Sequence, residues 1–170
     1  MTTTAVLSER EISSAHADLD IGACLAAAIG DADSYARHRA LYEDWLGYTR
    51  FDGPTHALTV RAHRFRAMLL SARHGQATHN LLGDRPLPIF TSGSGHIQVF
   101  LSAIPAPDDD VAQLEQNLFR TTAVIAGANA EVALPTPGND RRRWLSGLPP
   151  SLELPTYLEV VTAVTEAQRG

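Results

Sequence analysis

Three segments rich in proline, glycine, aspartate and serine interrupt the chain, at residues 83–95, 105–110 and 135–155. Glycine and proline punctuate regular secondary structure, so we expect these segments to form turns and loops. The patterned stretches around them are therefore the candidate helices and strands. With 170 residues, of which 44% are hydrophobic, the chain has the length of one domain and enough apolar side chains for a core.

The first third of the chain carries helical signals. Ser8 and Glu11 have the spacing of a capping box, in which the two side chains satisfy amides of the first helical turn. We therefore expect a helical extension over residues 1–30, ahead of a single folded domain over residues 31–170. Within that domain, residues 33–46 carry apolar side chains mostly at steps of three and four, which indicates a further helix.

Strand signals follow in the middle of the chain and near its end. Residues 96–104 alternate largely between apolar and polar side chains, which predicts a half-buried strand. Residues 55–73 fit a helix or strands equally well, because periodicity alone does not decide between them. A turn over residues 136–140 separates two short runs, 131–134 and 142–145, and predicts a hairpin.

Two helices are predicted in the second half of the chain. Three aspartates at residues 108–110 precede a strong helical pattern, and negative charge stabilises the N-terminal end of a helix. Pro155 is expected in the first turn of a closing helix, where its missing N–H costs nothing. The apolar face of the earlier helix consists of Val111, Leu114, Leu118, Phe119, Thr122 and Ile125.

Helices and strands do not alternate regularly in this order. A regular alternation is typical of a parallel sheet with crossover helices. The sequence therefore favours an α+β domain, with an antiparallel sheet on which helices pack.

Composition excludes several classes of function. The single cysteine, Cys24, leaves no internal disulfide and no cysteine-based zinc site. All 14 basic residues are arginine, which excludes lysine chemistry. The net charge of −5 argues against nucleic acid as the main partner. We expect a cytoplasmic protein, because no secretory signal is evident and no apolar run approaches the ~18 residues of a membrane span.

Seven histidines raise the alternative of a small histidine-containing enzyme or a metal-binding protein. His56 and His63 are seven residues apart, and His74 and His79 are five apart. Neither spacing matches the helical pair of a zinc site, and residues 53–83 contain no acidic side chain that could complete one. We therefore expect no catalytic residues, no metal ion and no cofactor.

The basic run Arg141, Arg142 and Arg143 could contact phosphate or an acidic partner. An ordinary solvated strand with a turn explains the same run. Trp45 and Trp144 fit the core first, although an aromatic side chain near a helix end or on a hairpin is also a common partner anchor.

Four stretches follow one another over residues 96–168: HIQVFLSAIP, DDDVAQLEQNLF, AEVALPTPGNDRRRWLSGLPP and ELPTYLEVVTAVTEAQ. In order and character they are similar to the last strand before the central helix, the start of that helix, the hairpin and the closing helix of the class I type III secretion chaperones, the CesT-like or Tir-chaperone family. Leu114, Asn117, Leu118 and Phe119 correspond to the family's LL-x-x-NLF pattern.

The resemblance implies a homodimer that binds the N-terminal segment of secreted effector proteins and keeps it extended and non-globular. It implies strands over residues 55–73. The secretion-apparatus ATPase is a further candidate partner. The residues that would contact the client are Leu41, Trp45, Trp144 and Leu145. The residues that would form the dimer interface are Leu114, Leu118, Phe119 and Thr122.

Overall fold

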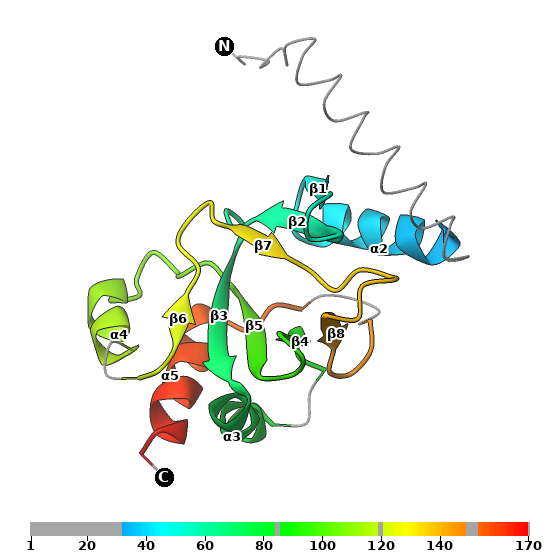
Figure 1. Ribbon diagram of the computed structural model, residues 1–170. Helices are drawn as coiled ribbons and strands as arrows, with labels where there is room; N and C mark the ends of the chain where they lie inside the picture. The colour runs from blue at the N-terminus through cyan, green and yellow to red at the C-terminus, as the bar shows by residue number, and fades with distance from the viewer. Residues whose placement is uncertain (1–31, 84–85, 119–120, 149–152, 170) are drawn as a thin grey trace, which may run out of the picture.

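The computed structural model describes residues 32–83, 86–118, 121–148 and 153–169 (Figure 1). The expected helical extension over residues 1–30, including Cys24, lies outside the described residues. The elements in chain order are α2 (Ala32–Trp45), β1 (Thr49–Asp52), β2 (Ala57–Arg61), β3 (Phe65–Ser71), α3 (Ala72–Leu82), β4 (Ile89–Ser92), β5 (Ile97–Ala103), α4 (Val111–Leu118), β6 (Val124–Ile125), β7 (Glu131–Ala133), β8 (Arg142–Trp144) and α5 (Tyr157–Ala167).

Two antiparallel sheets form the framework. The larger sheet has the strand order β6-β3-β5-β4-β8, and the smaller has the order β1-β2-β7. The chain passes from the smaller sheet to the larger one between β2 and β3, and returns between β6 and β7 (Figure 1). The predicted α+β class, with antiparallel sheets and packed helices, is confirmed.

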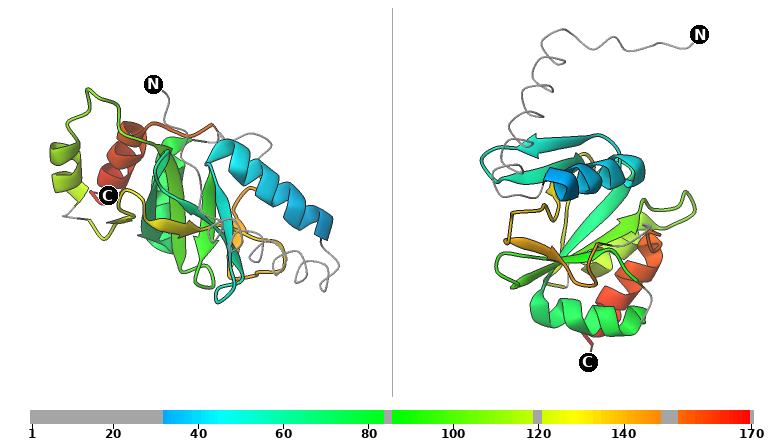
Figure 2. Two further views of the ribbon diagram at one scale, coloured as in Figure 1. Left: turned by 90° about the horizontal axis from the view of Figure 1, so that it is seen from above. Right: turned by 90° about the vertical axis from the view of Figure 1, so that its right-hand side faces the viewer.

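Both faces of the five-stranded sheet are covered. Side chains alternate between the faces of a strand, so Phe65 and Ala67 of β3 enter one core cluster while Met68 and Leu70 enter the other. The first cluster lies toward α2 and the smaller sheet, and the second lies toward α3 and α5 (Figure 2). The molecule therefore has three layers, with the larger sheet in the middle.

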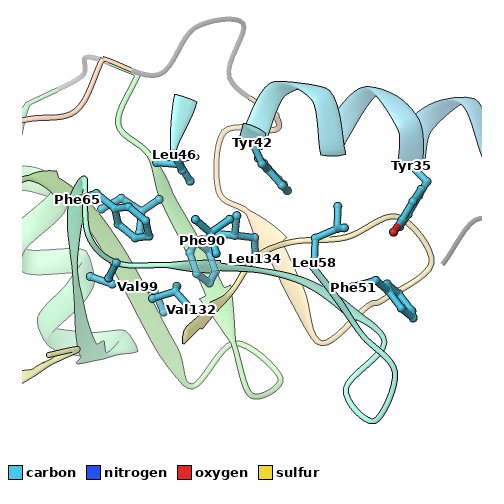
Figure 3. Packing of buried hydrophobic residues seen from close by; sticks show 14 residues of the cluster. Tyr35, Tyr42, Leu46, Phe51, Leu58, Phe65, Phe90, Val99, Val132 and Leu134 are labelled. Atoms are coloured by element: carbon cyan, nitrogen blue, oxygen red, sulfur yellow. The ribbon is translucent and has the colours of Figure 1, made fainter. Parts of the chain in front are cut away.

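The cluster between α2 and the two sheets is built mainly from aromatic and branched side chains (Figure 3). Tyr42 of α2, Leu46 just after that helix and Leu58 of β2 are fully buried there. A fully buried side chain of this size contributes roughly 1.5–3 kcal/mol to stability. The same cluster includes Phe90 of β4, which lies opposite Trp144 of the edge strand β8.

Residues 55–73, which periodicity left open, form the strands β2 and β3, as the resemblance implied. The strand predicted over residues 96–104 is also present, as β5. It is not half-buried, however, because Gln98 and Ser102 on its polar face are buried. The helical layer of α3 and α5 covers that face, which no local pattern in β5 predicts.

Helix α3 was not predicted. The Ser71 side chain accepts a hydrogen bond from the His74 amide at 3.5 Å and caps the helix. Gly75 lies so close to β5 that a Cβ atom there would come within 2.8 Å of the Gln98 Cβ. Glycine is a poor helix former, and its presence here is explained by this close approach.

The helix predicted with an apolar face over residues 111–125 is wrong in its second half. Helix α4 spans only Val111–Leu118, and Val124 and Ile125 pair with β3 as the edge strand β6. Valine and isoleucine favour strands because their branched side chains pack well on a pleated surface. Pairing of Val124 and Ile125 with the edge of β3 is therefore more favourable than continuing helix α4 through these residues.

The hairpin predicted over residues 131–145 is also wrong. Strand β7 pairs with β2, whereas β8 pairs with β4 in the other sheet. The Thr136 hydroxyl accepts from the Leu58 amide at 2.8 Å, and the Asn139 side chain donates to the Thr55 carbonyl at 2.9 Å. These bonds hold the connecting turn against the smaller sheet. The chain after the turn therefore runs to the larger sheet, where β8 pairs with β4.

The closing helix is present as α5. The expected first-turn position of Pro155 is wrong, because Thr156 is the N-cap and the helix begins at Tyr157, so that Pro155 precedes the cap. Thr156 and Glu159 form a complete capping box, in which each side chain satisfies a backbone amide of the other residue.

Candidate functional site

Strand β8 lies at an edge of the five-stranded sheet (Figure 1). The Leu145 amide donates to the Ile89 carbonyl at 3.0 Å, and Arg143 lies opposite Thr91 in the ladder. Alternate residues of an antiparallel strand direct their backbone groups to opposite sides. The backbone groups of Arg142 and Trp144 are therefore directed away from β4, toward the outer edge.

A hollow of about 260 Å³ adjoins this edge, and we call it the β8 hollow. Its walls come from the first half of α2, from the turn at residues 135–140 and from β8 with the residues that follow it. The charged, amide and aromatic side chains in the wall are His38, Asn139, Asp140, Arg142, Arg143 and Trp144.

Trp144 is held in a fixed orientation at the hollow. Its indole Nε1–H donates to the Tyr42 hydroxyl at 3.0 Å, and that hydroxyl donates to the Pro135 carbonyl at 2.6 Å. The indole also meets the ring of Phe90 edge-on, with the ring centroids 5.4 Å apart. Burial raises the pKa of Tyr42 well above its ordinary value, so the hydroxyl keeps its proton and remains a donor.

Arg142 contributes a positive charge that the chain only partly compensates. Its Nη1 atom is buried and has no acceptor among the described residues. Burial lowers the pKa of Arg142, and the neighbouring Arg141 lowers it further, while Asp52 opposes the shift. In contrast, Arg143 forms an exposed ion pair with Asp140 at 2.8 Å.

The predicted client-contact residues are only partly gathered at this hollow. Trp144 lines it, whereas Leu41, Trp45 and Leu145 do not. Trp45 is partly buried and packs against the first core cluster, and Leu41 is half-buried on α2. Leu145 follows β8 directly and is 40% exposed. The structure thus joins α2 to β8, but through Tyr42 rather than through the predicted residues of α2.

The predicted dimer residues have mixed positions. Leu118 is 3% exposed within the second core cluster, and Leu114 packs in part against that cluster. Thr122 is exposed, and its hydroxyl forms a 3.0 Å hydrogen bond with the ring of His74. Phe119 lies outside the described residues. Leu118 is therefore used mainly by the core of its own chain.

A second hollow of about 480 Å³ lies between α3 and α5. Leu81 and Leu158 form exposed apolar parts of its wall, and Glu159 and Glu166 add negative charge. We call this hollow the α3–α5 groove; it was not predicted, because helix α3 was not predicted.

The candidate metal pairs do not assemble into a centre. Among residues 32–83, 86–118, 121–148 and 153–169, no group of three or more histidine, cysteine, aspartate or glutamate side chains is placed to hold a metal ion. His74 instead contacts the hydroxyls of Ser71 and Thr122. In the same described parts of the chain, no helix has the length and apolar character needed to cross a membrane.

Comparisons of the chain with protein-family models, curated proteins and solved structures found no match. The resemblance to secretion chaperones therefore rests on the sequence motifs alone.

Proposed function

We propose that this protein binds extended segments of other polypeptides in the cytoplasm, in the manner of the class I type III secretion chaperones. Its clients would be secreted effectors, whose N-terminal segments it keeps non-globular before export. The observation that carries the proposal is the edge strand β8, which directs the backbone of Trp144 outward beside a hollow.

An exposed sheet edge can add a strand from another chain, because its outward N–H and C=O groups match those of an extended peptide. Strand β8 is short, with three residues. Backbone pairing therefore supplies few hydrogen bonds, and side-chain contacts in the β8 hollow must supply much of the affinity.

The edges formed by β1 and β6 are less suitable for this role. The outer edge of β1 is partly occupied, because the Arg39 guanidinium of α2 donates to the Thr49 carbonyl at 3.3 Å. Strand β6 has only two residues. The β8 edge differs from both in having a hollow and the exposed Leu145 next to it.

Homodimerisation and contact with the secretion-apparatus ATPase follow from the resemblance, and both belong to the proposal. Leu118 is buried in the core of its own chain. A dimer formed through α4 would therefore have its contacts on the outward side of that helix and at Thr122.

Site-specific photocrosslinking tests the proposal. A photoreactive residue at Leu145 in the full-length protein, expressed in its own host, should form adducts that mass spectrometry maps to the N-terminal segments of client proteins. The same residue at Tyr48, which is 62% exposed, serves as the control. Equal labelling at both positions contradicts the proposal, as does labelling that occurs mainly at Leu158 in the α3–α5 groove.

A further inference from the structure

Arg142 and Trp144 are two residues apart on β8, so their side chains lie on the same face of the strand. Both line the β8 hollow. The backbone groups of these two residues point to the outer edge, as the pairing with β4 requires, although the Arg142 amide already donates to the Asn139 carbonyl at 3.5 Å. A strand added to β8 would therefore place alternate side chains next to Arg142 and the indole.

The acidic side chains near Arg142 already have other partners. Asp140 pairs with Arg143 at 2.8 Å, and the Asp52 carboxylate accepts hydrogen bonds from the amide and hydroxyl of Thr55. Asp52 acts on Arg142 at longer range. The buried Nη1 of Arg142 has no acceptor in the described chain, an unfavourable arrangement that is rare in folded proteins.

We propose that the β8 hollow is a carboxylate subsite, which binds an aspartate or glutamate side chain of the client segment through Arg142. This inference rests on the proposed function. The guanidinium carries a planar fork of N–H donors that matches a carboxylate. Because its Nη1 atom is buried, the side chain must turn toward the hollow to use that donor. At about 260 Å³ the hollow has room for a side chain rather than a folded surface.

This assignment gives the client a sequence preference. The acidic residue must fall at one position in the added strand, and neighbouring positions face the opposite side of the sheet. Trp144 beside the subsite favours an apolar side chain two residues from the acidic one.

Display of short random peptides against the full-length protein tests the subsite. Selected peptides should carry aspartate or glutamate at a fixed spacing from an apolar residue. Exchange of that acid for its amide should weaken binding by about tenfold or more, as expected for the loss of a charge-assisted hydrogen bond. This comparison uses the unaltered protein and does not depend on the folding of any variant.

Variants then assign the interaction to one side chain. Arg142→Gln should abolish the preference for the acid, and Arg142→Lys should weaken it, because lysine keeps the charge but loses the fork. Arg141→Gln removes the same charge from a neighbouring exposed residue outside the wall of the hollow, and should keep the preference.

The outcomes separate the two proposals. If no peptide is selected, peptide binding itself is contradicted. If the selected peptides bind equally well after their acid is exchanged for the amide, the carboxylate subsite is overturned while peptide binding stands. The same holds if Arg141→Gln abolishes the preference for the acid as fully as Arg142→Gln does. A further outcome is that inorganic phosphate alone binds saturably at Arg142 while the acid of the peptide has no effect on peptide affinity. That result identifies a site for free anions and also overturns the subsite.

Discussion

The indole of Trp144 donates a hydrogen bond of 3.0 Å to the hydroxyl of Tyr42, which lies 102 residues earlier in the chain. This bond joins the edge strand β8 to helix α2. The same hydroxyl donates to the Pro135 carbonyl, so one buried group orients both the indole and the turn before β8. The shape of the β8 hollow depends on this arrangement.

Tyr42→Phe removes that hydroxyl and leaves the Trp144 indole N–H and the Pro135 carbonyl without this partner. We expect a loss of about 1–3 kcal/mol in the free energy of unfolding, the usual cost of unpaired buried polar groups. Urea denaturation measures it, with Tyr48→Phe at an exposed position as the matched control. Equal stability of the two variants contradicts the role assigned to Tyr42.

Gly75→Ala should destabilise the protein although alanine favours helices by about 1 kcal/mol over glycine. The added Cβ would lie within 2.8 Å of the Gln98 Cβ, so α3 must move away from β5. Overpacking of this kind costs about 1–3 kcal/mol. Gly53→Ala, where no atom lies within 4 Å of the new Cβ, is the control in the same thermal unfolding series. A Gly75→Ala variant with raised stability would show that α3 does not pack as described.

Stability should fall as the pH rises above 10. Burial, with a contribution from the Glu115 carboxylate, raises the pKa of Tyr157 to about 12 from an ordinary value of 10.0. Between these values the unfolded chain loses a proton that the folded chain keeps, so rising pH favours unfolding. Urea unfolding on both sides of pH 10 measures the slope. Tyr157→Phe should reduce the slope, and an unchanged slope argues against a buried hydroxyl at this position.

The resemblance to secretion chaperones predicts a homodimer. Light scattering of the full-length protein at micromolar concentration should give twice the 18.4 kDa of one chain. A mass of one chain under these conditions counts against the family assignment, although it leaves strand addition at β8 open to its own test.

The local sequence pattern was sufficient to predict those helices and strands whose own residues show a clear periodicity. Residues 33–46 and the end of the chain formed the expected helices, and residues 96–104 formed the expected strand. Helix α3 was missed because His74, Gly75, Thr78 and Asn80 are weak helix formers, and its packing on α5 and β5 outweighs that weakness. The hairpin prediction failed because Thr136 and Asn139 bond to the smaller sheet.

The candidate site was predictable only in part for the same reason. Trp144 and the arginine run stood out in the sequence, and the spacing of Arg142 and Trp144 already places them on one face of a strand. Tyr42 gave no such signal, because its importance comes from a hydrogen bond across 102 residues. The burial of Arg142 likewise depends on how β8 packs in the folded chain.

The central claim, that an extended client pairs with the edge of β8, is tested most directly by backbone N-methylation along a display-selected peptide. A methyl group blocks a hydrogen bond only where the peptide N–H faces β8. The account predicts that calorimetry will show weaker binding for methylation at alternate residues and unchanged binding for those between. Equal effects at all positions, or no effect at any, would contradict strand addition.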